Sequence, residues 1–234
     1  MAGSSPLSLP SPMPPHSDYA ALFDNNRRWV HRVNETRPDF FPTLARQQAP
    51  KFFWIGCADS RVPANEVIDL APGEVFVHRN VANVMPHSDM NSMSTLQFAV
   101  DVLRVEHILV VGHYGCGGVR AVLEGARVGL VDNWLGHVGD VLERHATRLS
   151  GLSGQDRWDR LCELNALEQA HNVCRTTVLQ DAWTRGQQVV VHACVYGLKD
   201  GLLRDLGLVA GDARGAADSF ARALESIDHG TTPR

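Results

Sequence analysis

The stretch that decides the fold is HILVVGHYGCGGV, residues 107–119, an apolar run that ends abruptly in a histidine, a cysteine and four glycines. Its apolar start is typical of a buried central strand in a parallel sheet. The glycines that follow permit a turn tight enough for His113 and Cys116, three residues apart, to converge. The stretch therefore predicts a strand that delivers two metal-ligating side chains to one end of a sheet.

Similar apolar runs predict further strands at residues 52–56 (FFWIG), 74–78 (EVFVH) and 187–197 (QQVVVHACVYG). Between and after them, helical patterns occur at 62–70, 92–106, 117–125, 131–149, 157–185 and 216–228. Strands that alternate with helices predict an α/β fold, with a mostly parallel central β-sheet covered by helices on both faces. Ligands of such sheets bind beyond the carboxyl ends of the strands, so Cys57 is expected beside His113 and Cys116.

The two halves of this pattern have other interpretations when each is taken alone. A cysteine at a strand end is often a small core residue, and GHYGCGG resembles a phosphate-binding turn that lacks the Lys-Ser/Thr of a P-loop. Joined with CADSR, residues 57–61, the pattern favours a metal site. Two thiolates and one imidazole suit tetrahedral Zn²⁺, with Asp59 as an alternative fourth ligand.

Asp59 and Arg61 are spaced for a bidentate, charge-assisted pair that keeps the carboxylate ionised. Zinc lowers the pKa of bound water from about 15.7 towards 7, and an ionised Asp59 would orient the zinc-bound hydroxide. The chemistry that these residues offer is attack by hydroxide on a small electrophilic carbon.

The chain ends and the composition set the remaining expectations. Residues 1–17, rich in Pro and Ser, are expected to be a disordered tail, and residues 18–234 a single domain whose helical arm spans 18–36. A net charge of −4 without a basic tract argues against nucleic acid, and no apolar stretch approaches the ~20 residues that span a bilayer. The tail lacks the pattern of a secretory signal, and five cysteines are an odd number, so we expect reduced thiols in the cytoplasm.

CADSR together with HYGCGG resembles the β-class carbonic anhydrases, and the resemblance extends from about Leu22 to residues 196–206 (YGLKDGLLRDL). It implies the β-carbonic anhydrase fold, zinc on Cys57, His113 and Cys116, an Asp59–Arg61 dyad, and reversible hydration of CO₂ to bicarbonate and a proton. It also implies a homodimer or a dimer of dimers, in which the arm packs on the partner subunit.

The resemblance extends to a bacterial-type subset, called type II, whose resting site is closed with the aspartate on zinc. Trp54, Arg79 and Tyr196 match the positions of a non-catalytic bicarbonate site in that subset, which implies allosteric inhibition by bicarbonate and by low pH. Without the resemblance, we would interpret Trp54 and Tyr196 as aromatic residues of the core. Gln48 and Phe98 match positions that line the substrate pocket.

Two other functions fit the same residues. One is a hydrolase that cleaves a CO₂ analogue such as carbonyl sulfide or carbon disulfide. The same metal ligands would serve either activity, so they do not distinguish the two. The other is a non-enzymatic, zinc-stabilised protein that senses bicarbonate, although Arg61 has no use in a purely structural site. His192 and Cys194 alternate on one face of a strand like a ligand pair, and we interpret them as core residues.

Overall fold

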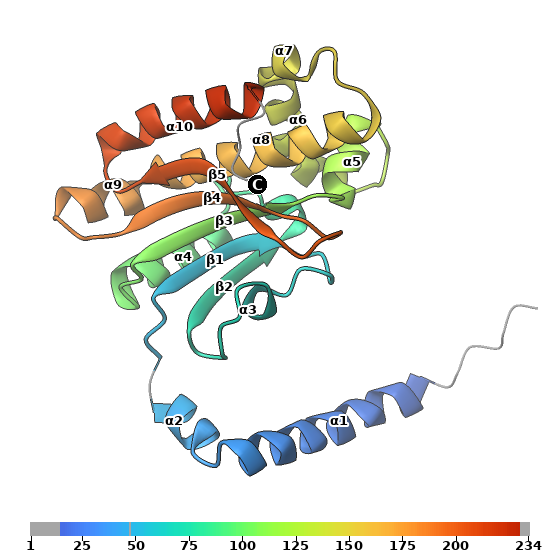
Figure 1. Cartoon of the computed structure of the whole chain (residues 1–234), viewed down its shortest axis with the longest axis vertical. Coiled ribbons are helices and arrows are strands. Elements are labelled where there is room, and N and C mark those ends of the chain that lie inside the picture. The colour runs from blue at the N-terminus through green and yellow to red at the C-terminus, as the bar shows by residue number, and fades with distance from the viewer. Residues whose placement is uncertain (1–14, 47, 230–234) are drawn as a thin grey trace, which may run out of the picture. The chain divides into compact units, whose positions relative to one another are not determined.

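The structure is a computed structural model that describes residues 15–46 and 48–229, and it divides into two compact units, whose boundary in the sequence lies between residues 47 and 48. The greater part of the expected tail, residues 1–14, lies outside the described residues. The first unit holds helices α1 (Pro15–Thr36) and α2 (Phe40–Arg46), drawn in blue in Figure 1. The helix expected at 18–36 thus begins three residues earlier, at a proline, which is well tolerated in a first helical turn.

Helix α1 exposes large apolar side chains. Its exposed apolar residues are Tyr19, Leu22, Phe23 and Trp29, whereas Val33 is buried. Trp29 packs edge-on against Phe41 of α2, with ring centroids 5.3 Å apart. An amphipathic helix that leaves its apolar side chains uncovered within its own unit has surface to offer to another molecule.

The second unit is built on one sheet with strand order β2-β1-β3-β4-β5. Its strands are β1 (Phe52–Cys57), β2 (Val75–Asn80), β3 (His107–His113), β4 (Val190–Tyr196) and β5 (Leu203–Ala210). The first four are parallel, as expected, and β5 runs antiparallel to β4 at the edge. Strand β5 was not predicted, because its polar residues and Gly207, at φ 81°, interrupt the apolar pattern.

Helices connect and cover the strands. They are α3 (Ala64–Val67), α4 (Met90–Gln97), α5 (Gly117–Leu123), α6 (Val131–Arg144), α7 (Ala146–Leu149), α8 (Gly154–Cys174), α9 (Thr177–Thr184) and α10 (Ala213–Asp228), with the short turns η1 (Val81–Asn83) and η2 (Phe98–Val102). The prediction of one helix over 157–185 was wrong. Helix α8 ends at Cys174, and α9 begins after Thr176, whose hydroxyl accepts a hydrogen bond from the Leu179 amide at 3.3 Å.

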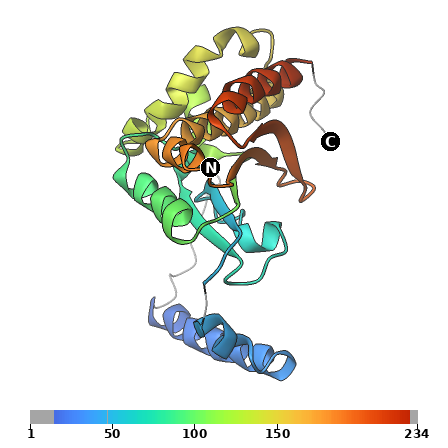
Figure 2. The same ribbon diagram turned by 90° about the vertical axis from the view of Figure 1, so that its left-hand side faces the viewer.

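The two faces of the sheet are covered unequally. Helices α4, α8, α9 and α10 lie against the main core on one face, whereas α3 and a smaller cluster around Trp54, Val111 and Cys194 occupy the other. Figures 1 and 2 show α8 and α10 together on one side of the sheet. The prediction of helices on both faces therefore holds only in part, and side chains such as Phe52 and Leu109 are left half-buried.

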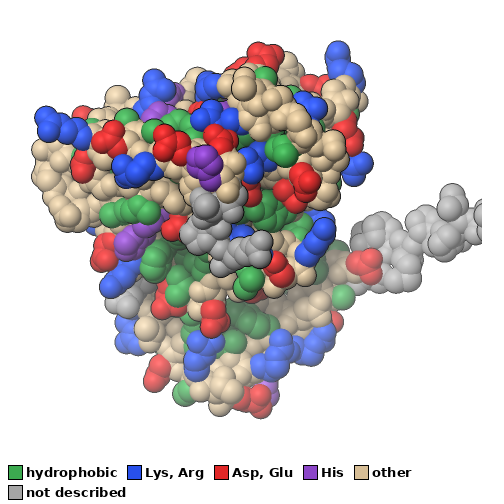
Figure 3. All heavy atoms as spheres, turned by 45° about the horizontal axis from the view of Figure 1, so that its top comes forward, with side chains coloured by type: hydrophobic (Ala, Val, Ile, Leu, Met, Phe, Trp, Pro, Cys, Tyr) green, Lys and Arg blue, Asp and Glu red, His purple; other side chains and the backbone are tan. Residues whose placement is uncertain are grey.

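The surface agrees with the weak net charge. On the face that Figure 3 shows, basic and acidic side chains are interspersed, with no basic patch. None of the helices in the described part of the chain is both long and apolar enough to cross a membrane.

Candidate metal centre

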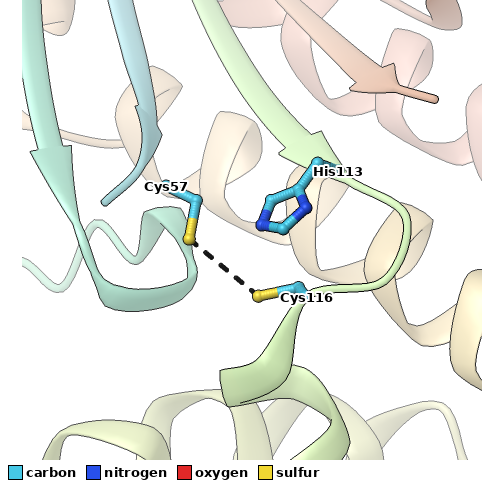
Figure 4. Close-up of side chains that lie close together, drawn as sticks. All are labelled: Cys57, His113 and Cys116. Atoms are coloured by element: carbon cyan, nitrogen blue, oxygen red, sulfur yellow. Dashed lines mark hydrogen bonds between the residues drawn. The ribbon is translucent and has the colours of Figure 1, made fainter. Parts of the chain in front are cut away.

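Three metal-ligating side chains converge at the carboxyl end of the sheet (Figure 4). Cys57 is the last residue of β1, His113 is the last residue of the neighbouring β3, and Cys116 follows in the turn before α5. Their ligand atoms all lie within 4.8 Å of one another, and the two Sγ atoms are 4.0 Å apart. All three side chains are buried. The predicted convergence of two thiols and an imidazole is therefore present.

The imidazole of His113 is oriented for coordination. Its Nδ1 donates a hydrogen bond to the carbonyl oxygen of Tyr114 at 3.0 Å, which leaves a lone pair on Nε2. Nε2 is buried and has no hydrogen-bond partner among the described residues. An unpartnered buried nitrogen is costly, so a cation at this position satisfies an atom that the protein itself leaves without a partner.

The pKa values of the two cysteine thiols are shifted in opposite directions. The hydrogen bond between the Cys57 and Cys116 thiols, together with the nearby His113, lowers the pKa of Cys57 below its usual value, although burial opposes the shift. The neighbouring Cys57 thiolate and burial raise the pKa of Cys116 far above its usual value. One thiolate thus forms readily, and a bound divalent cation would release the second proton by stabilising both charges.

The donor set fits Zn²⁺. Two thiolates at Zn–S distances of about 2.3 Å in tetrahedral geometry are separated by roughly 3.8 Å, close to the observed 4.0 Å. Three protein ligands leave one coordination position for water or for Asp59, as in catalytic zinc sites.

Asp59 is paired with Arg61 beside the three ligands. Arg61 donates from Nε to Oδ1 at 2.9 Å and from Nη2 to Oδ2 at 2.7 Å, and its backbone amide also donates to Oδ1. These hydrogen bonds hold the pKa of Asp59 well below its usual range. Asp59 Oδ2 lies 3.8 Å from His113 Nε2, so the ionised carboxylate lies beside the three candidate ligands.

Arg79 contacts the segment that carries Cys57 and Asp59. Its Nε donates to the Cys57 carbonyl at 2.7 Å, and its Nη2 donates to the Asp59 carbonyl. Trp54 and Tyr196 lie in the smaller core cluster on the same face of the sheet, where Trp54 is fully buried. Among the described residues, the indole N–H of Trp54 has no acceptor. The position of Trp54 agrees with the core-packing interpretation. Its indole N–H, however, lacks the hydrogen-bond acceptor that a buried donor usually has.

The two expected pocket residues lie away from the metal ligands within one chain. Gln48 is exposed in the segment before β1. Phe98, 43% exposed, packs against Phe76 of β2 with ring centroids 5.8 Å apart. Phe76 pairs with Phe53, four residues before Cys57 on β1, so Phe98 lies nearer the amino ends of these strands than their carboxyl ends.

Helix α8 holds the ligand turn at two points that the sequence did not reveal. Trp158 donates from its indole N–H to the Cys116 carbonyl at 3.0 Å, and the Arg120 guanidinium lies over its ring at 5.2 Å. Tyr114 donates from its hydroxyl to Glu163 at 2.6 Å. Trp158 and Glu163 come more than forty residues after the turn that they hold, and no local pattern signals such contacts.

Replacing Trp158 by phenylalanine is expected to weaken zinc binding by about 10- to 100-fold, the usual cost of losing a group that orients a metal ligand. The phenyl ring keeps most of the packing but cannot donate to the Cys116 carbonyl. Competition with a chelator, followed by metal analysis, measures the change. Trp183→Phe is the matched control, because that indole donates to Val189, away from the site, at 2.9 Å. Equal zinc affinity in both variants would contradict the role of Trp158.

Comparison with known proteins agrees with this geometry. Residues 52–203 match the family model described as carbonic anhydrase. A carbonic anhydrase from Emericella nidulans is 45% identical over 188 residues, which cover 80% of this chain and 82% of the relative. One from Saccharomyces cerevisiae is 30% identical over 198 residues, with 81% of this chain and 89% of the relative covered.

Solved structures agree as well. A Coccomyxa β-carbonic anhydrase in complex with acetazolamide superposes with a TM-score of 0.82 at 37% identity, covering 91% of this chain and 98% of the other. A tetrameric β-carbonic anhydrase from Sordaria macrospora superposes with a TM-score of 0.78 at 33% identity, covering 82% of this chain and 98% of the other.

Proposed function

The chain belongs to the β-class carbonic anhydrase family and is a carbonic anhydrase, and we propose that Cys57, His113 and Cys116 hold its zinc while Asp59 and Arg61 orient the attacking oxygen. The observation that supports this most strongly is the convergence of the three ligand atoms beside an ionised aspartate. Family membership sets aside the non-enzymatic alternative.

The protein groups have separate tasks in CO₂ hydration. When bound, Zn²⁺ supplies hydroxide near neutral pH by lowering the pKa of water. Asp59 accepts a hydrogen bond from the attacking oxygen and thereby turns a lone pair towards the carbon of CO₂. Arg61 keeps both carboxylate oxygens aligned, because its fork-shaped guanidinium binds them simultaneously. The products are bicarbonate and a proton that passes to solvent.

Stopped-flow measurement of CO₂ hydration, with metal analysis of the same sample, tests this proposal. The expected result is one zinc per chain and an activity that disappears when a chelator removes the metal. Parallel assays with carbonyl sulfide and carbon disulfide test the hydrolase alternative. A chain that holds zinc and turns over only the sulfur compounds would contradict the proposed substrate.

We further propose that bicarbonate inhibits through Arg79, as in the type II subset. Arg79 is hydrogen-bonded to the carbonyls of Cys57 and Asp59. An anion that competes for this guanidinium would release the segment and let Asp59 leave Arg61 for the metal. The unpartnered indole N–H of Trp54 and the hydroxyl of Tyr196 are donors on the same face of the sheet and would complete the anion site.

Arg79→Ala is therefore expected to raise the bicarbonate concentration that gives half-inhibition by about 10-fold or more, since hydrogen bonds to charged groups contribute about 1.5–3 kcal/mol. Inhibition is compared as a ratio to each variant's own uninhibited rate, because Arg79 also positions the ligand segment. Arg148→Ala, which removes a half-buried arginine paired with Asp228, is the control. Unchanged inhibition in Arg79→Ala would discard the allosteric site.

We propose that the enzyme works as a homodimer or a dimer of dimers. The exposed apolar side chains of α1 and the half-buried second face of the sheet are both surfaces that a second copy would cover. Gln48 and Phe98 would then line the substrate pocket of the partner subunit, which explains their distance from the ligands of their own chain. The Sordaria macrospora relative, which is described as tetrameric, supports this assembly.

We also retain the cytoplasm as the proposed compartment. The five cysteines of the chain all lie in the described part and are free thiols, as a reducing compartment favours.

A further inference from the structure

The short turn η1, which follows β2, holds two consecutive residues in the left-handed region of backbone conformation. Ala82 has φ 63° and ψ 26°, and Asn83 has φ 48°. In the described part of the chain, no other two adjacent non-glycine residues both have a positive φ. Asparagine visits this region readily, but alanine does so at a cost, because its Cβ crowds the backbone. Such strain persists only where the surrounding contacts impose it, and it clusters at functional sites.

The turn contacts the segments that carry two of the candidate zinc ligands. The carbonyl of Asn80, directly before the turn, accepts a hydrogen bond from the amide of Ala58 at 2.8 Å, and Ala58 follows Cys57. On the neighbouring strand β3, a Cβ atom added to Gly112, which precedes the ligand histidine, would lie 3.8 Å from the side-chain oxygen of Asn83. The turn thus lies beside the ends of both β1 and β3.

The segment of the third ligand packs against the same turn. A Cβ atom added to Gly118, two residues after Cys116, would lie 3.2 Å from Cγ1 of Val81 and 3.4 Å from Cβ of Ala82. Glycine at this position therefore lets the first turn of α5 approach η1 closely. A change in the conformation of η1 would disturb the surroundings of all three ligands.

Asn165 of α8 holds the strained residue of the turn. Its Nδ2 donates to the carbonyl of Ala82 at 2.8 Å, and both residues are buried. Its Oδ1 accepts a hydrogen bond from Nε2 of Gln169 at 3.1 Å. Oε1 of Gln169 in turn accepts from the amide of Met85, just beyond the turn, at 2.8 Å. A buried network of amides that satisfy one another is rigid, so it fixes the backbone on both sides of Asn83.

Two further contacts fix the ends of the turn. The indole N–H of Trp134 in α6 donates to the carbonyl of Val81 at 2.8 Å. The side chain of Asn80 bonds both the amide and the carbonyl of Val84, each at 2.8 Å. These contacts hold the residues that flank the strained pair, whereas Asn165 bonds Ala82 itself.

We propose that Asn165 is a positioning residue of the metal centre, which fixes the mutual positions of Cys57, His113 and Cys116 by holding Ala82 in its left-handed conformation. The inference rests on the zinc site proposed above. Without the hydrogen bond from Asn165, the turn is free to relax its strain, and the three ligand segments lose a common support. Groups that orient metal ligands in this way contribute to metal affinity without touching the ion.

Core packing alone predicts a different outcome. An asparagine that merely fills space between α8 and the sheet would lower thermal stability when replaced, whatever residue stands at position 82. The two explanations differ for Ala82→Gly, because glycine adopts a positive φ without a steric cost. A glycine there is expected to keep the turn left-handed even when the hydrogen bond from Asn165 is absent.

The first measurement is zinc affinity, from competition between the zinc-loaded enzyme and a chelator. Asn165→Leu fills a similar volume but cannot donate to the Ala82 carbonyl, and it is expected to weaken zinc binding by about 10- to 100-fold. Adding Ala82→Gly to this variant is expected to recover about 5-fold or more, the factor by which the left-handed conformation disfavours alanine. The control is Gln180→Leu, which removes a half-buried amide that donates to the Cys174 carbonyl, away from the site, at 2.6 Å.

The second measurement is the visible spectrum of the cobalt-substituted enzyme, because Co²⁺ accepts the same thiolate and imidazole ligands and its bands report their geometry. Asn165→Leu is expected to shift the bands, and the double variant Ala82→Gly/Asn165→Leu to return them towards those of the wild type. A purely structural role would lower the melting temperature and leave the bands unchanged.

The wild type separates this inference from the proposed function. If the wild-type chain holds no zinc, the proposed function fails, and the inference fails with it. If it holds one zinc, two results would overturn the inference alone. One is an Asn165→Leu variant that binds zinc as tightly as the wild type, and the other is an equal loss of affinity in Asn165→Leu and in the double variant. If Asn165→Leu does not fold, Asn165→Ala, which removes the donor without adding an apolar branch, decides by the same comparison.

Discussion

Asp59→Asn is expected to lower the rate of CO₂ hydration by about 10²- to 10⁴-fold while zinc stays bound, the range that a positioned acid–base group contributes. Asparagine has the shape of the aspartate but no charge. Its amide cannot accept hydrogen bonds at both terminal atoms, so the contact with Arg61 at 2.9 and 2.7 Å is lost on one side. The attacking oxygen then loses its orienting acceptor.

The pKa of Asp59 also bears on how the effect of this substitution depends on pH. Hydrogen bonds from Arg61 hold that pKa well below its usual range, so the carboxylate is ionised throughout the neutral range and loses its charge only in strong acid. The titration of Asp59 itself is therefore expected to add no pH dependence to the rate deficit of Asp59→Asn between about pH 6 and 9, since the usual carboxyl pKa is already near 4.

Stopped-flow rates and zinc content of the same samples measure the effect. Asp101→Asn is the matched control, because Asp101 also pairs with an arginine, Arg185, on the surface away from the metal ligands. Full turnover by Asp59→Asn would remove Asp59 from the mechanism. Loss of zinc from it would instead make Asp59 a structural ligand.

Cys57→Ala is expected to abolish both stoichiometric zinc and activity, and to lower the melting temperature by about 10 °C in zinc-containing buffer. Metal that binds only the folded state at a thousandfold excess over Kd stabilises it by about 4 kcal/mol. In a chain of this size, each kcal/mol corresponds to about 2–4 °C. The remaining two ligands, His113 and Cys116, cannot hold the ion in a buried tetrahedral site.

The control for Cys57→Ala is Cys174→Ala, which removes a thiol that is equally buried but lies in α8 outside the site. Both variants lose packing, so the decisive readout is the shift in melting temperature on adding Zn²⁺. That shift is expected in the wild type and in Cys174→Ala, and not in Cys57→Ala. If Cys57→Ala binds zinc stoichiometrically, the ligand assignment is wrong.

Local pattern was enough to predict the core of the fold and the convergence of Cys57, His113 and Cys116. Each parallel strand is a short apolar run, and the glycines around Cys116 allow the turn that brings it back to His113. Parallel strands place their carboxyl ends at one edge, so Cys57 and His113 had to meet once the strands were recognised. The same logic identified Asp59 and Arg61, which follow Cys57 directly.

Tertiary structure alone decided the features that depend on contacts between distant segments. Trp158 donates a hydrogen bond to the Cys116 carbonyl, and His107 is hydrogen-bonded to His192. The partners are too far apart in the sequence for any periodic pattern to predict these contacts. The edge strand β5 forms because β4 offers it a hydrogen-bonding partner, in spite of its own polar pattern. The break between α8 and α9 was likewise hidden within one helical periodicity.

The sequence by itself determined which side chains meet in the candidate metal centre, because residue identity and strand ends are local properties of the chain. Only the tertiary structure decided how those side chains are held, with Nδ1 of His113 on a carbonyl, Asp59 on Arg61 and Arg79 on the backbone of the ligand segment. The reason is that orientation comes from hydrogen bonds whose two partners are brought together only when the chain has folded.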